Sequence, residues 1–367
     1  MPEPLTDPYA HRFGTSPPFS LGVEEELLLV DPATLGLVSS AELVLDGLSG
    51  PLAERVSSEI FTEQIELKTG VCLKADEALA ELREARAVIA RNGVRLLGSG
   101  LHPADAGEAK LVAKPRYEVV REDLGDLLNT PPCGLHVHVG ISDPETAVQL
   151  ANAFTQYLPV LSALAANSPY RAGADTGHAS ARTQVVRAYP RFQVPRRFRD
   201  YEDFCRVADQ LIAAAGVDDY TYIWWDVRPH PNLGTVEVRG MDVQSTVAGN
   251  AGFAALVQGL AAREIERPST TDLQREALEE SYYQATRYGM EARLMVDGGE
   301  ALPATEVATL ALAEARPYAE ELGDAGALAE IERILADGNG ADRQRHAFER
   351  GGIPAVLDYL AEATAAD

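Results

Sequence analysis

The sequence predicts an α+β fold, with an antiparallel β-sheet, flanking helices and a helical C-terminal part. Two patterns lead to this class. Short segments that alternate polar and β-forming residues are interleaved with longer helical patterns, and from about residue 272 onward the pattern is almost wholly helical. In addition, the turn at 229–233 contains two prolines and an asparagine between two predicted strands, which indicates an antiparallel hairpin.

The predicted elements follow in order along the chain. Strands with alternating β-forming residues are expected at 19–30, 58–69, 135–141, 222–228 and 234–239. Helices are expected at 74–90, 144–166, 201–215 and 245–266. Asp76 is the expected N-cap of the first helix, and Ser142 or Asp143 that of the second, because short polar side chains accept hydrogen bonds from the first turn.

Composition and charge narrow the classes of function. The chain has 367 residues, 46% hydrophobic and 24% charged, as is usual for a soluble globular protein. No long apolar run indicates a membrane partner, and the net charge of −24 argues against nucleic acid, whose phosphates need a basic face. Three widely spaced cysteines, at 72, 133 and 205, favour a reducing cytoplasm over a disulfide framework.

The domain organisation is simple. Residues 1–17 are rich in proline and polar groups and are expected to form a flexible N-terminal arm, and residues 18–367 a single domain. The C-terminal helices could cover the sheet or mediate homo-oligomer formation, and their periodicity favours neither. The chain contains neither a GxGxxG sequence nor a Walker GxxxxGK[ST] sequence, so the two commonest phosphate loops are missing.

Chemistry is indicated by one device that recurs on successive strands. Polar residues stand at positions i and i+2, which the two-residue period of a strand directs to one face. Valines at 137, 227, 236 and 238 occupy alternate positions, so the opposite face is apolar. Glu24 and Glu26 share the polar face, with Glu25 opposite. Further members of that face are Glu63, Glu66, His136, His138, Asp226, Arg228, Glu237 and Arg239.

Such a charged face is wet, paired or bound to metal, because burying unpaired charges costs several kcal/mol each. Carboxylate oxygens with at most one imidazole suit Mg²⁺ or Mn²⁺ better than zinc. Carboxylates for metal and arginines for anions are together the inventory of phosphoryl transfer. A solvated face or a ladder of cross-strand ion pairs, such as Glu237 with Arg239, is the plainer alternative. Eight arginines between 171 and 206 likewise indicate either a bound anion or a solvated surface.

An ordered set of motifs resembles the bacterial type 2 glutamate–cysteine ligases, also called carboxylate–amine ligases. The matching segments lie in order between about residues 18 and 290. They are PFSLGVEEE at 18–26, IELKT at 65–69, GSGLHP at 98–103, GLHVHVG at 134–140, ANSPYRAGADTG at 166–177, WDVRP at 225–229, GTVEVR at 234–239 and RYG at 287–289.

The resemblance implies a glutamine-synthetase-like fold, a curved antiparallel sheet forming a funnel with metals and ATP on its concave face. It implies that residues 18–367 are one catalytic ligase domain for small-molecule substrates. ATP would phosphorylate the γ-carboxylate of a glutamate-like acid, and an amine such as cysteine would then displace phosphate. The amine, the general base and the oligomeric state are left open.

The resemblance also assigns roles to individual residues. It implies metal ligation by Glu24, Glu26, Glu66, His136 or His138, and Glu237, and contacts of Arg228 and Arg239 with phosphate or acyl-phosphate oxygens. It places four further residues in the nucleotide and substrate pocket, which are Asn167, Asp175, Thr176 and Arg182. The acidic strand around Glu59, Glu63 and Glu66 leaves open which further carboxylate contributes.

Two other classes of enzyme share parts of this inventory. His136-Val-His138 is similar to the His-x-His of amidohydrolase barrels, which bind zinc and hydrolyse amides, but the sequence lacks the alternating βα units of such barrels. A guanidino kinase shares the ligase fold and the phosphoryl chemistry, and would form a phosphoguanidine without an amide.

Overall fold

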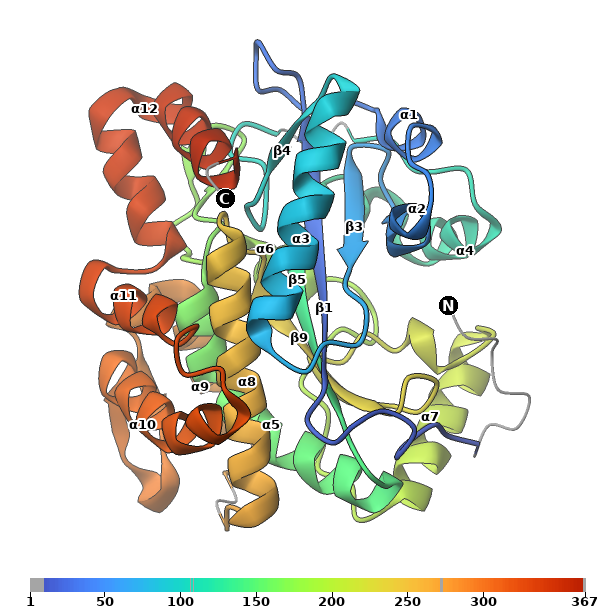
Figure 1. The fold of residues 1–367 in the computed structure, drawn as a ribbon, viewed down its shortest axis with the longest axis vertical. Helices are drawn as coiled ribbons and strands as arrows, with labels where there is room; N and C mark the ends of the chain where they lie inside the picture. Colours follow the sequence, from blue (N-terminus) through green and yellow to red (C-terminus); the bar gives the residue numbers. More distant parts are fainter. Residues whose placement is uncertain (1–9, 106, 108, 271–272, 366–367) are drawn as a thin grey trace.

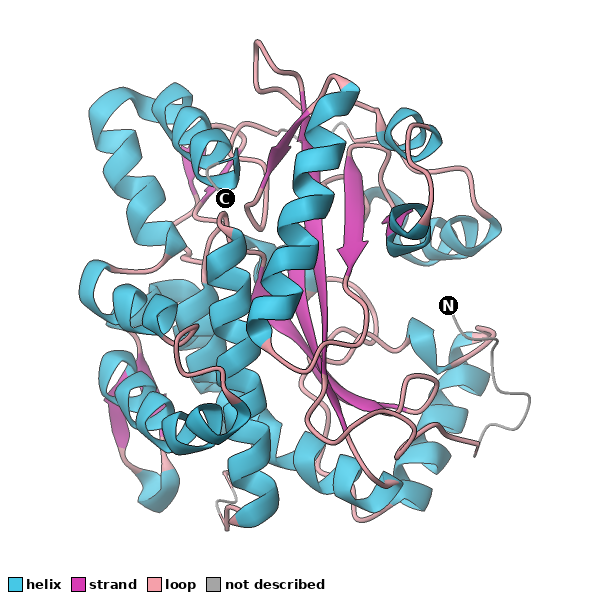
Figure 2. Ribbon diagram, viewed as in Figure 1, coloured by secondary structure: helices cyan, strands magenta, loops and turns pink. Residues whose placement is uncertain are grey.

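A seven-stranded antiparallel sheet is the centre of the computed structural model, which describes residues 10–105, 107, 109–270 and 273–365. Its strands run in the order β2-β3-β1-β5-β9-β8, with β4 also paired to β1. Figure 2 shows the strands in magenta among the surrounding helices. They are β1 (Leu21–Val30), β2 (Val56–Ser58), β3 (Gln64–Lys68), β4 (Arg95–Leu97), β5 (Gly134–Gly140), β8 (Val227–His230) and β9 (Thr235–Asp242). The predicted α+β class is confirmed, and the antiparallel pairing differs from the parallel barrel of amidohydrolases.

Three helices pack on one face of this sheet, α3 (Ala75–Ile89), α5 (Pro144–Ala165) and α8 (Val247–Glu266). Figure 1 shows α3 and α8 side by side against the strands. The alternate valines of β5, β8 and β9 belong to the same buried apolar cluster as these helices. The apolar face predicted from the alternation is therefore the one that the helices bury, which leaves the polar face on the other side.

The helix starts test the predicted caps. The Asp143 carboxylate accepts a hydrogen bond from the Thr146 N–H at the start of α5, so Asp143 is the cap. For α3 the prediction is wrong: Lys74 occupies the cap position, and Asp76 lies inside the first turn. A carboxylate there is still favourable, because it faces the positive end of the helix dipole.

The C-terminal part packs on the helical layer. It contains α9 (Arg275–Tyr288), α10 (Ala304–Leu322), α11 (Ala329–Asp337) and α12 (Gly340–Ala365), with a short hairpin of β10 (Arg293–Met295) and β11 (Ala301–Pro303) that the helical prediction missed. Helices α10 and α11 contact α8, and α12 lies beside β4 (Figure 1). These helices therefore thicken the layer behind the sheet.

The sheet departs from the predicted strands in three places, the first of which is β4, a strand that was not predicted. The strand expected at 58–69 is interrupted at 59–63, so β2 and β3 are separate. The strand expected at 222–228 starts only at Val227, because Asp219 accepts a hydrogen bond from the Thr221 N–H and winds 220–222 into a 3₁₀ turn. Of the other helices and strands, α7 (Tyr201–Ala215) was predicted. Those that were not predicted are α1 (Ala41–Asp46), α2 (Pro51–Arg55), α4 (Pro115–Leu124), α6 (Ala181–Val186), β6 (Tyr170–Arg171) and β7 (Ala174–Asp175).

Part of the predicted N-terminal arm can be placed. Residues 1–9 lie outside the described residues, whereas residues 10–17 run along the end of the sheet. The Gly14 N–H donates to the Ile141 carbonyl at 2.8 Å, and Phe13 is buried in the main core. The three cysteines are free and buried. Each helix in the described part of the chain is too short or too polar to traverse a lipid bilayer.

Candidate active site

The register of the central strands brings the predicted metal ligands onto one face. On β1, Glu24 is the cross-strand partner of His136, and Glu26 is that of Glu66. Glu237 on β9 stands opposite the second histidine of β5. Direct cross-strand neighbours point the same way and have their Cβ atoms about 5 Å apart. The structure therefore collects six predicted residues in one place, Glu24, Glu26, Glu66, His136, His138 and Glu237.

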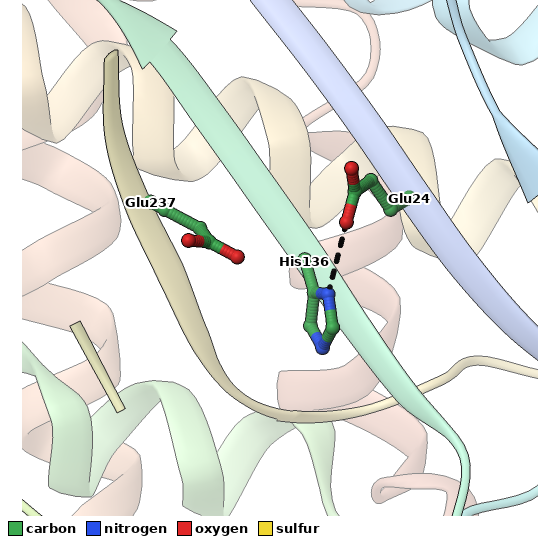
Figure 3. Close-up of side chains that lie close together, drawn as sticks. All are labelled: Glu24, His136 and Glu237. Carbon is green, nitrogen blue, oxygen red and sulfur yellow. Dashed lines mark hydrogen bonds and ion pairs between the residues drawn. The ribbon is translucent and has the colours of Figure 1, made fainter. Parts of the chain in front are cut away.

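One group that could hold a metal ion consists of Glu24, His136 and Glu237. Each offers one ligand atom, and these atoms lie within 4.8 Å of one another. Figure 3 shows the three side chains converging from three neighbouring strands, with the Glu24 Oε2 atom 3.2 Å from His136 Nδ1. The separations leave room for a cation between the groups, since a metal lies about 2 Å from each ligand.

A second group shares the same histidine. Glu26, Glu66 and His136 also offer ligand atoms within 4.8 Å of one another. The Glu26 Oε1 atom lies 3.9 Å from His136 Nε2, and its Oε2 atom accepts a hydrogen bond from the Gly134 N–H at 2.6 Å. A neutral imidazole has one free lone pair, so His136 can ligate one cation at a time, and the carboxylates of the other group would hold a second cation without it.

The two histidines have different environments. Burial and Arg239 lower the pKa of His136 to about 4, which keeps the ring neutral and able to bind metal. Burial alone would lower the pKa of His138, but Glu237 and Glu24 raise it. The His138 Nε2 atom is buried with no hydrogen-bond partner among the described residues, 3.7 Å from Glu24 and 3.8 Å from Glu237. This orphaned nitrogen between two carboxylates also fits a missing cation.

The carboxylates are unequally compensated. Burial raises the pKa of Glu26, against the partial compensation of Arg182, and burial with Glu24 raises that of Glu66. Burial would likewise raise the pKa of Glu237, but Arg228 and other cations hold it well below its usual range. The side of the site around Glu26 and Glu66 therefore carries more negative charge than its neighbours balance.

The alternation of the strands missed Glu59. It lies in the interruption between β2 and β3, where burial together with Glu66 and Glu26 raises its pKa well above the usual range. Glu63, predicted on the polar face, instead accepts hydrogen bonds from the Ser39 hydroxyl and the Lys110 N–H. A strict two-residue period that includes Glu66 puts both Glu59 and Glu63 on the opposite face, so the period cannot rank these two carboxylates, and the break in the strand between β2 and β3 decides where each one points. The cluster of acids in this segment is the only sequence signal for Glu59.

Two arginines flank the first group, as predicted. The Arg228 Nε atom donates to Glu237 Oε2 at 2.7 Å, and its Nη1 atom to the Ile223 carbonyl at 2.6 Å. Arg239 also contacts Glu237, and its buried Nε atom has no partner among the described residues. Asp226 was predicted on this face, but it forms an ion pair with Arg187 at 2.9 Å instead.

Among the predicted pocket residues, Arg182 lies beside the carboxylates. It is buried 3.8 Å from Asp242, it influences the pKa of Glu26, and its Nε atom has no partner among the described residues. Gly134 makes room for it, because a Cβ atom there would lie 2.3 Å from Arg182 Nη2.

The other three predicted pocket residues lie away from the carboxylates, and their place in the nucleotide and substrate pocket stays a prediction. Asn167 is fully buried and its amide donates to the Gly98 and Val243 carbonyls, so it joins loops together. Asp175 is at the surface and forms an ion pair with Arg345. Thr176 lines a separate cavity of about 350 Å³. Proximity in the sequence to a motif therefore did not bring these side chains to the carboxylates.

The donor set determines which cation fits. The first group offers two carboxylates and one imidazole, and so does the second, whereas the buried cysteines lie outside both groups. Oxygen-rich sets of this kind suit Mg²⁺ or Mn²⁺, and zinc favours nitrogen and sulfur. The flanking guanidinium groups of Arg228 and Arg239 suit phosphate oxygens.

Comparisons with known proteins point to one family. Residues 20–358 match the model of glutamate-cysteine ligase family 2 (GCS2). A relative from Rubrobacter xylanophilus named "Putative glutamate--cysteine ligase 2-3" is 41% identical, with 96% of this chain and 99% of the relative covered. A glutamate–cysteine ligase from Haloquadratum walsbyi is 36% identical, with 95% of this chain and 96% of the relative covered. The fold is similar to a crystal structure of a glutamate–cysteine ligase from Francisella tularensis in complex with AMP, with a TM-score of 0.67, 14% identity, and 95% and 89% covered.

Proposed function

The chain belongs to glutamate-cysteine ligase family 2, and we propose that it couples a glutamate-like acid to an amine at the expense of ATP. Family membership makes it an ATP-dependent carbon–nitrogen ligase. The product proposed here is a γ-glutamyl amide, formed through an acyl phosphate. The amine is cysteine, as in the names of the relatives, or a related small amine.

One observation carries the proposal. Two pairs of carboxylates, Glu24 with Glu237 and Glu26 with Glu66, surround the neutral imidazole of His136, and two arginines beside them both contact Glu237. A simple hydrolase would need an activated nucleophile or water, but not two arginines beside the candidate metal ligands. Phosphoryl transfer needs charge screening and positioning above all, and these groups provide both.

The reaction is balanced in two steps. An oxygen of the γ-carboxylate attacks the γ-phosphorus of ATP, the bond to the β-phosphate oxygen breaks, and ADP leaves. The nitrogen of the amine then attacks the acyl carbon, the carbon–oxygen bond to phosphate breaks, and the nitrogen loses a proton. Phosphate is a far better leaving group than the oxide of a free carboxylate, which is why ATP is required.

The residues of the chain hold these partners in place. Mg²⁺ or Mn²⁺ bound by the two groups would screen the phosphates and orient the γ-phosphoryl group. The buried Nε atom of Arg239, which has no partner in the part of the chain that the structure describes, can donate to a phosphoryl oxygen. Arg228 is anchored by the Ile223 carbonyl and Glu237, which fixes its planar fork. Arg182, on the Glu26 side, can bind a carboxylate of the acid or the amine.

We place the reaction in the cytoplasm, where the free thiols of the chain and of a cysteine substrate would stay reduced. The substrates are small molecules.

The test is a screen for ADP release with ATP, Mg²⁺ and glutamate against a panel of amines, with the mass of each product recorded. The proposal expects ADP release that needs both the acid and an amine, and a product whose mass equals acid plus amine minus water. A phosphorylated guanidine as the product would instead indicate a kinase. Amide hydrolysis without ATP, in a protein that retains zinc, would indicate an amidohydrolase.

A further inference from the structure

Lys68 lies between the two groups of candidate ligands. It is the cross-strand partner of Glu24 on β1, and its Nζ atom is 2.5 Å from Glu66 Oε2 and 3.9 Å from Glu24 Oε1. Glu24 belongs to the first group and Glu66 to the second. A single ammonium group therefore contacts one carboxylate from each candidate metal position.

The identity of this residue matters. The chain has 32 lysines and arginines, and only four are lysines, at 68, 74, 110 and 114. The other cations on this face, Arg228 and Arg239, hold Glu237 with guanidinium groups. Lysine differs from arginine because its charge is compact and its stem is flexible, so the ammonium group can leave a carboxylate without moving the backbone. About a quarter of the Lys68 side chain is exposed, so the ammonium group can move toward solvent.

We propose that Lys68 is a resident cation that neutralises Glu66 and Glu24 when no metal is bound, and that it competes with a divalent ion for Glu66. The inference deepens the proposed ligase function and rests on its metal site. It assigns Lys68 as the residue that sets the affinity of the second group for metal.

Charge on the Glu66 side makes this exchange necessary. Glu66 lies among Glu24, Glu26 and Glu59, and its negative charge and theirs repel each other. Without a cation, several carboxylates would be held together in a buried place at a cost of several kcal/mol. Lys68 supplies one positive charge there. The ligase stays folded while it is free of metal because the ammonium group stands in for the ion.

The same contact opposes metal binding. A divalent ion ligated by Glu66 needs the oxygen lone pairs that the ammonium group holds at 2.5 Å, and it also repels the positive charge. The ammonium group therefore has to withdraw as the ion binds. A purely structural ion pair would behave differently, because its removal would destabilise the protein equally with and without metal.

The experiment compares the metal-free full chain with its Lys68→Met and Lys68→Arg variants. Isothermal titration calorimetry with MgCl₂ gives the affinity, and thermal unfolding at increasing MgCl₂ gives the stability. Lys110→Met is the matched control, because Lys110 is an exposed lysine and its replacement changes the net charge equally.

We expect Lys68→Met to bind Mg²⁺ about tenfold more tightly at one class of site. Its melting temperature without metal should fall by several degrees, and the deficit should close at saturating Mg²⁺. Lys68→Arg keeps the charge and should bind Mg²⁺ no more tightly than the wild type. Lys110→Met should bind Mg²⁺ with the affinity of the wild type. Should Lys68→Met not survive metal removal, titration of Lys68→Arg still decides, because tighter binding by that variant contradicts the competition.

Unchanged or weaker Mg²⁺ binding by Lys68→Met, or a stability deficit that persists at saturating Mg²⁺, would overturn the inference. The outcome is separable from that of the ligase proposal. A chain that releases no ADP with any amine but shows these shifts refutes the ligase function and leaves the role of Lys68 standing. An active ligase without the shifts refutes only the role of Lys68.

Discussion

Three consecutive glutamates on β1 have different environments on the two faces of the sheet, Glu25 on one face and its two neighbours on the other. Glu25 points to the helical side, where it is fully buried and receives two hydrogen bonds from Arg86 at 2.9 and 2.7 Å. Asn250 adds a third at 2.5 Å. Glu24 and Glu26 point to the other side, into a cluster with more carboxylates than cations.

The contrast separates structural from functional charge. On the helical side every oxygen of Glu25 is matched by a donor, and Arg86 also donates to the Ser245 carbonyl at 2.8 Å. Such a closed network needs nothing from outside. The polar face of the sheet, with Glu24 and Glu26, is called the open side below. There, buried nitrogen atoms of His138, Arg182 and Arg239 have no partner among the described residues. Unsatisfied buried groups are costly, so their retention indicates ligands that arrive later.

The largest effect is expected from breaking the open side. Glu26→Gln keeps the shape of the side chain but removes a charged metal ligand, so ADP release dependent on glutamate and Mg²⁺ should fall by about a thousandfold or more. The stability of the metal-free protein should stay the same or rise, because burial disfavours the ionised form of Glu26. Coupled-enzyme detection of ADP and thermal unfolding measure the two effects. Full turnover in this variant would remove Glu26 from the metal site.

The second effect concerns the closed side and should appear in stability. Arg86→Met leaves Glu25 buried without its main partner, so the free energy of unfolding should fall by ~3–5 kcal/mol. Urea denaturation measures it. The ADP release of the remaining folded molecules should be close to that of the wild type, because Arg86 does not reach the open side.

The double variant Glu25→Gln with Arg86→Met is the control for the second effect. It removes both charges, so it should recover part of the lost stability. If Arg86→Met were as stable as the wild type, the distinction between a closed and an open side would fail.

The same contrast explains what the sequence could predict. Residues that follow the two-residue strand period were found, because Glu24, Glu26, His136, His138 and Glu237 need only regular pairing to meet. Arg239 joins them although the register of β5 and β9 shifts beside it, between Leu135 and Val137. Glu59 was left open among the acids of its segment, because the strand breaks at 59–63 and its period cannot be followed there. Glu63 was misplaced for the same reason. Such breaks depend on contacts with distant segments, such as the Lys110 N–H that binds Glu63.

Residues placed by long-range packing were the least predictable. Asn167 and Thr176 were assigned to the nucleotide and substrate pocket by a linear motif, and the structure places them away from the carboxylates, Asn167 against other loops and Thr176 at a separate cavity. Arg182 lies only a few residues further along and does reach Glu26, because α6 carries it past Gly134. No local periodicity distinguishes these outcomes, since the path of the loop decides them.

A third prediction sharpens the role of the arginines on the open side. Arg228→Lys keeps the positive charge but cannot hold both the Ile223 carbonyl and Glu237 with one planar fork. ADP release should fall by about ten- to a hundredfold, with most of the loss in kcat. Steady-state kinetics measure it, with the far-UV circular dichroism spectrum as a check on folding. Activity equal to the wild type would show that Arg228 contributes charge alone.

The smallest effect is expected at Glu59, and it depends on pH. Burial and the neighbouring carboxylates raise the pKa of Glu59, so the folded, metal-free protein holds a proton that the unfolded chain has already lost. The stabilisation linked to this proton is complete below the pKa of the unfolded chain, about 4.3, and is lost as the pH rises through the higher pKa of the folded state. Glu59→Gln removes this loss.

Metal-free Glu59→Gln should therefore be about as stable as the wild type near pH 4 and about 1 kcal/mol more stable at pH 8. Urea denaturation across this range measures the difference, and the comparison with wild type cancels the opposite trends of Glu24 and Glu237. Glu42→Gln, an exposed position on α1, is the matched control and should show no such divergence. Because a bound ion would favour the ionised carboxylate, the advantage of Glu59→Gln should disappear once Mg²⁺ is added. A stability advantage of Glu59→Gln that persists in Mg²⁺ would show that Glu59 lies outside the metal site and has a structural role, as Glu25 has.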